Sequence, residues 1–305
     1  MQTLLSIRSL ALAATLFAGA ASAQTVTTAP PALPQVGFSI IKTSKVAVAE
    51  RLLLPDGSLG KKIDTNFSAF LIKHQSDYVL FDTGLGRNIE AQYAQDMPYW
   101  QRPFFKFDKP VLPARKQLDD AGFAPVQKVI VSHSHWDHAG GVQDFPEAQI
   151  FAAADEMPTI AEPKSGAGGT WPSQVADPAI HWTPLLLQPV AHKGYAHSLD
   201  LFNDGSVVLV AMPGHTTGSI GMFVTVDSGK CYFFIGDVAW KAGAVQAGAS
   251  KFWAASIIVD RNRDQTLRSV EQVRDVARKY PELVVVPAHD GAVQDALGYF
   301  PSWVR

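Results

Sequence analysis

The densest group of residues able to bind a metal lies in one short stretch, VIVSHSHWDHAGG, at Val129–Gly141. Three histidines and one aspartate fall within six residues of it, at His133, His135, Asp137 and His138. Imidazole nitrogens and carboxylate oxygens are borderline ligands that suit zinc, iron or manganese. Four ligands from one loop exceed what a single open tetrahedral ion would take, so the stretch favours two ions that share the site.

Further polar residues each follow an apolar run of strand length. His215 lies in PGHTTGS, Asp237 in FIGDVAW and His289 in VVVPAHD. Asp82, in VLFDTG, has the same placement upstream. A lone His or Asp after a strand is usually a turn or cap residue. Together with the histidine-rich stretch, however, these positions predict one shared site at the edge of a sheet.

The elements that must position these residues are mostly short strands. Apolar runs of strand length and composition recur along the chain. They lie near Phe38 and at Phe67–Ile72, Tyr78–Asp82, Lys128–Ser132, Ala148–Ala153, Ser206–Met212, Gly221–Val226, Cys231–Gly236 and Leu283–Ala288.

Helical patterns are fewer. The clearest covers Asp264–Tyr280, which has one apolar face and an aspartate, Asp264, placed to cap its start. Shorter helices are expected at Ala114–Ala121, Gly140–Phe145 and Ala153–Ala161. Many strands interspersed with helices predict an α/β protein in which two sheets pack face to face with helices outside.

Composition and charge narrow the class of protein. The chain has 305 residues, of which 47% are hydrophobic, enough for a sizeable core in one large or two small domains. Its 26 Lys and Arg nearly balance 28 Asp and Glu, and without a basic block we expect no nucleic-acid partner. Cys231 is the only cysteine, so a metal site must be built from histidine and carboxylate.

The N-terminus has the pattern of a secretory signal. Arg8 supplies the positive charge, Leu10–Ala20 is apolar, and Ala21–Ala23 is a small-x-small cleavage site. The apolar run is too short to favour a spanning helix, with an uncleaved anchor as the alternative. We therefore predict export to the periplasm or outside the cell, with no stable membrane anchor after cleavage. The predicted organisation is a signal peptide at 1–23, a flexible leader at 24–36 and one domain at 37–305.

The segments HSHWDH, PGHTTG, GD, PAHD and FDTG together resemble the signature segments of the metallo-β-lactamase-fold hydrolases, over about Asn66–Trp303. The resemblance implies an αββα sandwich, with two mixed β-sheets and helices on the outer faces. It implies two divalent ions, zinc being expected. One would be held by His133, His135 and His215, and the other by Asp137, His138 and His289. Asp237 would bridge the ions, and Asp82 would orient ligands from behind.

Such a site would perform hydrolysis. Two cations lower the pKa of bound water from about 15.7 towards about 7, which provides a hydroxide nucleophile at neutral pH. They also polarise a carbonyl or phosphoryl oxygen. Asp137 can then pass a proton to the leaving group, so the expected catalytic carboxylates are Asp137 and the bridging Asp237. No Ser-His-Asp triad is needed, and we interpret Ser132 and Ser134 as loop residues.

Within the superfamily, the N-acyl-homoserine lactonases resemble the chain most widely. The similarity extends to the long helix before PAHD and to the closing FPSWV, Phe300–Val304. It implies a small substrate with an apolar tail, a quorum-quenching role, and a monomer or homodimer. The alternatives are an organophosphate hydrolase of the methyl-parathion type, a glyoxalase II-like thioesterase and a β-lactamase. A metal-binding protein without turnover is the least favoured.

One position departs from the lactonase pattern. Lactonases usually carry a tyrosine three residues after the bridging aspartate, where this chain has Trp240. An indole donates one N–H but cannot act as an acid, which strengthens the alternatives of an organophosphatase or of a hydrolase for a different ester. Trp136, Trp240 and Phe105 are the expected pocket residues, with Phe105 on an aromatic, proline-rich excursion at Pro98–Pro113. Packing in the core is the alternative for these rings.

Overall fold

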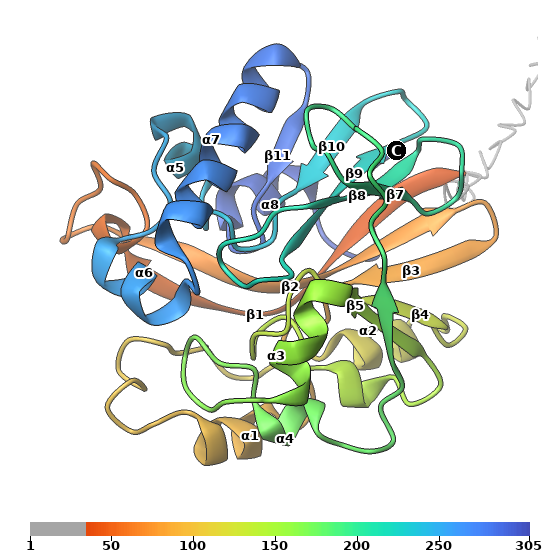
Figure 1. Ribbon diagram of the computed structural model, residues 1–305. Coiled ribbons are helices and arrows are strands. Elements are labelled where there is room, and N and C mark those ends of the chain that lie inside the picture. The colour runs from red at the N-terminus through yellow and green to blue at the C-terminus, as the bar shows by residue number, and fades with distance from the viewer. Residues whose placement is uncertain (1–34) are drawn as a thin grey trace, which may run out of the picture. The chain divides into compact units, whose positions relative to one another are not determined.

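The computed structural model describes residues 35–305 (Figure 1). The predicted signal peptide at 1–23 and the leader up to residue 34 lie outside the described residues. The first strand begins at Val36, one residue before the predicted start of the domain at residue 37. The main-chain N–H groups of Gln35 and Val36 donate to the carboxylate of Asp227, at 2.9 and 2.7 Å, and fix the chain there.

The first sheet has six strands in the order β1, β2, β3, β4, β5, β6. Its strands are β1 (Val36–Ala49), β2 (Lys62–His74), β3 (Asp77–Phe81), β4 (Lys128–Ile130), β5 (Gln149–Ala153) and β6 (Trp182–Leu185). The pairs among β1, β2 and β3 are antiparallel, and those from β3 to β6 are parallel. The carboxyl ends of β3, β4 and β5 therefore meet at one edge.

The second sheet has five strands in the order β11, β10, β9, β8, β7. Its strands are β7 (Ser198–Asp200), β8 (Val207–Ala211), β9 (Ile220–Thr225), β10 (Cys231–Phe234) and β11 (Val284–Val286). All its pairs are antiparallel except β10 with β11. Both sheets are mixed, as predicted, and the carboxyl ends of β8, β10 and β11 point to a common edge.

Helices cover the outer faces of the two sheets (Figure 1). They are α1 (Ile89–Asp96), α2 (Ala114–Asp120), α3 (Met157–Ala161), α4 (Pro172–Val175), α5 (Ala242–Ala247), α6 (Trp253–Val259), α7 (Arg263–Lys279) and α8 (Gly291–Leu297). Leu118 of α2 packs in the cluster outside the first sheet, and Val270 and Val273 of α7 pack in the cluster outside the second. The predicted αββα sandwich is confirmed. None of the helices between residues 35 and 305 is long and apolar enough to span a bilayer.

The core follows the period-2 alternation of its strands. Phe70 and Ile72 of β2 lie in the cluster between the sheets, where Leu209 of β8 and Phe234 of β10 meet them. Leu71, the residue between them, points to the opposite face and joins the outer cluster under α2. Neighbouring strand residues face opposite sides, so one apolar run supplies two core layers. The rigid sandwich that results holds the strand ends in place.

Three helix predictions need correction. The long helix begins at Arg263, and its cap is Asn262 instead of Asp264, because the Asn262 side chain accepts from the N–H of Gln265 at 3.0 Å. Gly140–Phe145 forms only a 3-10 turn at Val142–Asp144. A longer helix does not start here, because the N–H of Gly141 donates to the hydroxyl of Thr83 and so holds the backbone against the loop after β3.

The predicted helix at Ala153–Ala161 is also interrupted. A 3-10 turn at Ala154–Glu156 precedes α3, which starts at Met157 with Pro158 in its first turn. The Glu156 side chain turns inward and is fully buried, which fixes the backbone before the helix begins.

Candidate metal centre

The predicted ligands converge at the shared edge of the two sheets. The loop after β4 carries His133, His135, Asp137 and His138. From the second sheet, His215 follows β8, Asp237 follows β10 and His289 follows β11. Three groups of these side chains have ligand atoms within 4.8 Å of one another: His133, His135 and His215; His133, His138 and Asp237; and Asp137, His138 and His289.

Asp237 lies between the two outer groups. Its Oδ2 is 3.5 Å from Nε2 of His215. Its Oδ1 is 3.2 Å from Nε2 of His138 and 3.0 Å from Nε2 of His289. One carboxylate thus faces a histidine of each group, which is the placement a bridging ligand needs.

Several inward-facing atoms are buried without a hydrogen-bond partner. They are Nε2 of His133, His138 and His215, and Oδ1 of Asp237. The contact between Nε2 of His138 and Oδ1 of Asp237, at 3.2 Å, lacks hydrogen-bond geometry, although the charges are close. Buried polar atoms are nearly always satisfied, so a cluster of unsatisfied lone pairs aimed at one point fits a bound cation. The cluster therefore suits divalent metal binding.

The outward-facing ring nitrogens, in contrast, are paired. The Nδ1 contacts are His133 with Ser132 Oγ at 3.0 Å, His138 with Asp82 Oδ2 at 2.8 Å, His215 with Asp260 Oδ1 at 2.8 Å, and His289 with the carbonyl of Asn66 at 2.7 Å. A ring that donates its Nδ1–H keeps the lone pair on Nε2 for a metal. These partners fix both the tautomer and the direction of each ligand.

Asp82 has the orienting position that the family resemblance implies. Besides His138, its carboxylate accepts from the N–H of Ser132 at 2.6 Å and from the Ser132 hydroxyl at 2.9 Å. Asp82 is fully buried and has a φ of 57°, a strained backbone conformation for this residue type. The contacts to the ligand loop hold it in this conformation. Ser132 is a loop residue as interpreted, and its hydroxyl links Asp82 to His133.

Burial and neighbouring charge set the protonation of the cluster. Burial lowers the pKa of His133 and His135 well below the usual value, and nearby imidazoles lower it further. Burial also lowers the pKa of His215. The three rings are therefore neutral at pH 7, as metal ligands must be.

In the other group and at Asp237, neighbouring charges outweigh burial in setting the pKa of two side chains, His138 and Asp237, but not that of Asp137. Burial disfavours the charged form of His138, but the carboxylates of Asp82 and Asp237 outweigh it and raise its pKa well above the usual value. The pKa of Asp137 is raised by burial. Burial acts the same way on Asp237, but His289 and His138 outweigh it and hold its pKa well below the usual value. Buried carboxylates here need a positive partner, and a divalent ion supplies one.

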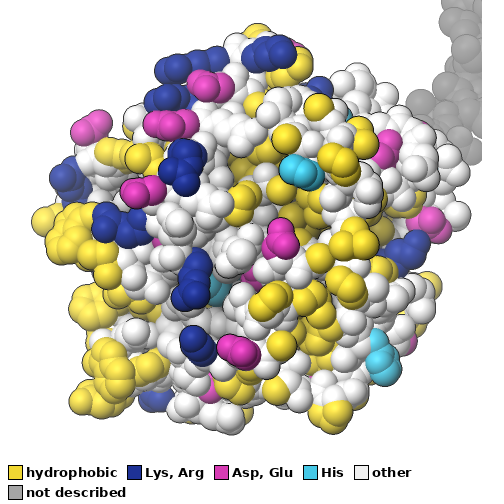
Figure 2. Space-filling model, in the orientation of Figure 1, with side chains coloured by type: hydrophobic (Ala, Val, Ile, Leu, Met, Phe, Trp, Pro, Cys, Tyr) yellow, Lys and Arg dark blue, Asp and Glu magenta, His cyan; other side chains and the backbone are white. Residues whose placement is uncertain are grey.

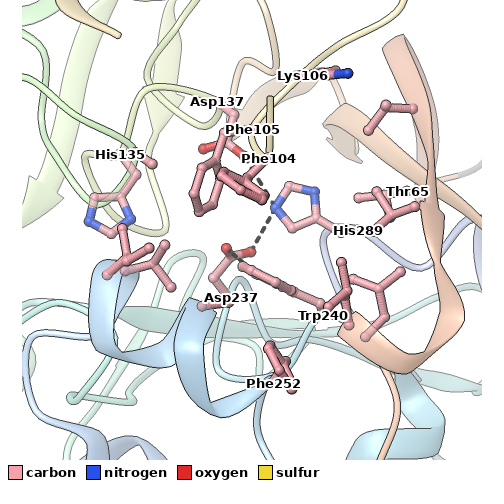
Figure 3. A pocket seen from close by; sticks show the side chains of 18 of the residues that line it. Thr65, Phe104, Phe105, Lys106, His135, Asp137, Asp237, Trp240, Phe252 and His289 are labelled. Atoms are coloured by element: carbon pink, nitrogen blue, oxygen red, sulfur yellow. Dashed lines mark hydrogen bonds and ion pairs between the residues drawn. The ribbon is translucent and has the colours of Figure 1, made fainter. Parts of the chain in front are cut away.

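An apolar cavity of about 330 Å³ opens beside the cluster, and five of the predicted ligands line it: His135, Asp137, His215, Asp237 and His289. Apolar side chains form most of the remaining wall, including Val46 and Val48 of β1. Figure 3 shows Phe104 and Phe105 facing Asp237 and Trp240 across this space. In Figure 2, hydrophobic side chains also gather at the left edge, over α6 and the 98–113 segment. Phe104, on the 98–113 segment, is 73% exposed.

The three predicted pocket residues differ in how they contribute. Phe105 and Trp240 line the cavity and are partly exposed. Trp136 also borders the cavity but is only 3% exposed. Its ring stacks on Trp171 at 5.1 Å, so it is as much a core residue as a pocket residue.

Trp240 uses its indole N–H within the protein. Nε1 donates to Oδ2 of Asp237 at 2.7 Å. The indole N–H, at the position where lactonases usually carry a tyrosine, thus orients the aspartate that is predicted to bridge the ions. This arrangement uses the only polar atom of the indole.

A second cavity, of about 460 Å³, reaches His135 and His215 from the other side of Ile258 and Val259. Its lining is polar and includes Asp155, Glu162, Lys164 and Arg261. The cluster therefore adjoins two spaces of different character, and the first is the more apolar.

The chain matches the family model of the Metallo-beta-lactamase superfamily over residues 66–289. This span includes every candidate ligand and Asp82. The chain belongs to the metallo-beta-lactamase superfamily. The prediction of a metal-dependent hydrolase with this fold is confirmed at that level.

Relatives of this superfamily member include a probable metallo-hydrolase and an N-acyl homoserine lactonase. It is 27% identical over 240 residues to "Probable metallo-hydrolase Rv2300c" of Mycobacterium tuberculosis, covering 72% of this chain and 73% of the relative. It is also 27% identical over 229 residues to "N-acyl homoserine lactonase AttM" of Agrobacterium fabrum, covering 72% of this chain and 80% of the relative.

Solved structures share the fold. An N-acyl homoserine lactone hydrolase with N-hexanoyl-L-homoserine at its catalytic metal centre superposes with a TM-score of 0.67, over 89% of this chain and 100% of that one, at 15% identity. AidC, described as a dizinc quorum-quenching lactonase, gives a TM-score of 0.55 over 90% of this chain and 91% of that one, at 16% identity.

Sequence reasoning missed several buried charged residues around the site of this metallo-beta-lactamase-fold protein, among them Glu156, Lys251 and Asp260. Glu156 accepts from the Ser134 N–H at 2.9 Å and from the Thr216 hydroxyl at 2.7 Å, and so ties the first histidine loop to the loop of His215. Lys251 and Asp260 pair at 2.9 Å with both side chains fully buried. Glu156 follows a predicted strand just as the ligands do, and that placement was the available signal.

Proposed function

We propose that the protein is a dinuclear metal-dependent lactonase, with N-acyl-homoserine lactones as its leading substrates and quorum quenching as its role. The observation that carries this proposal is the placement of Asp237. Its carboxylate faces a histidine from each of two metal-binding groups and lines an apolar cavity large enough for an acyl chain. Two zinc ions are the expected cofactors.

Each of the predicted ligands has a part in this reaction. Two divalent ions would lower the pKa of a coordinated water and polarise the scissile carbonyl. One ion would be held by His133, His135 and His215, and the other by Asp137, His138 and His289. Asp237 would bind both ions. Asp137 lines the cavity, with Oδ2 3.3 Å from Nε2 of His289, and is placed to hand a proton to the leaving alcohol.

The apolar arm of the substrate would lie against aromatic walls. Phe105 and Trp240 border the cavity, although they are far apart in the sequence. Val46 and Val48 extend the apolar surface along β1. A lactone with an acyl tail presents an ester to the ligands and methylene groups to these walls. That division matches the polar floor and the apolar sides of the cavity.

An organophosphate hydrolase is the second candidate, and Trp240 favours it. The Trp240 indole N–H already donates to Asp237, so it is not free to hold a lactone carbonyl as a tyrosine hydroxyl would. A phosphotriester would depend on the ions alone to polarise its phosphoryl oxygen.

Metal analysis and a substrate panel test the proposal together. Protein purified with zinc should contain two ions per chain and lose hydrolysis on chelation. The panel should include acyl-homoserine lactones, simple lactones, paraoxon-type triesters, thioesters and a cephalosporin. We expect the acyl-homoserine lactones to react fastest. One ion or none would contradict the dinuclear site, and rapid triester turnover without lactone opening would favour the second candidate.

We also propose that the protein is exported. The proposal is supported by Arg8, the apolar Leu10–Ala20 and the cleavage pattern at Ala21–Ala23. Mass spectrometry of the native protein should find a chain that starts near Gln24. An intact Met1 in a soluble cytoplasmic fraction would contradict export.

A further inference from the structure

A buried lysine contacts two separate parts of the metal centre. The Lys251 ammonium donates to Oδ1 of Asp260 at 2.9 Å and also to the main-chain carbonyl of Asp237. Asp260 Oδ1 in turn accepts from Nδ1 of His215 at 2.8 Å. The lysine therefore reaches one predicted ligand through its backbone and another through a carboxylate.

The pair is closed to solvent. The side chains of Lys251 and Asp260 are both 0% exposed. The other carboxylate oxygen of Asp260 accepts from the Ser256 hydroxyl, so Asp260 is held from three directions. The ammonium also lies 5.6 Å from the centre of the Trp240 ring, whose N–H donates to Asp237. Burying an ammonium is costly, and this one has its compensating partners at the ligands.

We infer that Lys251 is a positioning residue, which acts through Asp260 and the Asp237 backbone to hold His215 and the bridging aspartate in one arrangement. The inference deepens the proposed function, because it depends on a metal bound by these ligands. A ligand that is not held in direction loses metal affinity, typically by about 10- to 100-fold when its supporting partner is removed. Lys251 supports two ligands, one of which is shared between the ions.

Lys251 could instead serve only to neutralise a buried Asp260. The two roles predict different zinc affinities once both charges are removed. If neutralisation were the whole role, Lys251→Met combined with Asp260→Asn would restore zinc affinity, because no unpaired charge remains. If positioning is the role, the double variant folds stably and still binds zinc weakly.

Competition with a chromophoric chelator for Zn²⁺ tests the inference, with Co²⁺ absorption spectra as a second readout of ligand geometry. We expect Lys251→Met and Asp260→Asn each to weaken zinc binding by about 10- to 100-fold and to alter the cobalt spectrum. The double variant should lose little more affinity than the weaker-binding single variant, because the two residues act as one unit. The double variant also keeps the test available if Lys251→Met alone fails to fold.

Lys73→Met is the matched control. Lys73, near the end of β2, is also buried, at 7% exposure. Its ammonium donates to the carbonyl of Gln75 and not to a predicted ligand. It should leave zinc affinity unchanged even if it lowers the melting temperature. Parental affinity in Lys251→Met, restored affinity in the double variant, or independent losses that multiply would overturn the inference. A parent protein that binds no zinc would instead refute the proposed function.

Discussion

Replacing Asp237 by alanine should lower kcat/KM for the best substrate by at least about 1,000-fold. Asp237 is the only described carboxylate that faces a histidine of both outer metal groups. Its loss would leave each ion one ligand short and remove their link. A metal stabilises the transition-state charge by several kcal/mol, and about 4 kcal/mol corresponds to about 1,000-fold in rate.

The rate and the metal content should be measured on the same sample. We expect fewer than two zinc ions per chain in Asp237→Ala, with a circular dichroism spectrum like that of the parent. Asp204→Ala is a suitable control, because Asp204 also contacts a histidine, His74, at 2.7 Å but is 43% exposed at the surface. If Asp237→Ala retains two ions and most of its activity, the bridging role is wrong.

The convergence of the candidate ligands could be predicted from the sequence because their positions result from simple geometry. Each one comes directly after a run of strand residues, and parallel strand ends meet at one edge. His215 and His289 are 74 residues apart in the sequence, yet both follow strands of the same sheet. The strand runs and the residue types at their ends were enough to predict this convergence, whereas the assignment of each residue to an ion came from the family resemblance.

The supporting residues could not be predicted in the same way. Lys251 precedes α6 and Asp260 follows it, in a segment with no pattern that indicates burial of charge. Their pairing depends on how α6 packs near His215, which is a tertiary contact. A lysine and an aspartate nine residues apart are usually solvent-exposed.

The missed elements are short or ambiguous. β6 is WTPL, an edge strand with a proline, and β7 is only three residues long. α6, WAASIIV, is apolar almost throughout, so periodicity alone does not separate a helix from a strand. The 98–113 segment has neither helix nor strand, as its prolines indicate, and only tertiary structure decides which of its rings reach the cavity.

We expect kcat/KM to rise with the length of the acyl chain, because rings of the 98–113 segment line the cavity. The walls of the cavity are apolar, so each methylene that enters should contribute about 0.8 kcal/mol, or about 4-fold in kcat/KM. Four added methylenes should therefore raise kcat/KM by about 200-fold, until the cavity is filled. A homologous series of acyl-homoserine lactones measures this slope directly.

Phe105→Ala should flatten that slope, because Phe105 lines the cavity and is partly exposed. Phe107→Ala is the matched control, since Phe107 has the same ring on the same segment but packs against Tyr93, at 5.3 Å, and does not line the cavity. Trp136→Ala is less informative, because Trp136 also stacks in the core and its loss would destabilise the fold by about 3 to 5 kcal/mol. A slope near zero in the parent, or equal flattening in both phenylalanine variants, would show that the acyl chain binds elsewhere. Flattening in Phe105→Ala alone would place the acyl chain against the wall that Phe105 forms. Each variant removes one phenyl ring, and the two rings differ in whether they line the cavity.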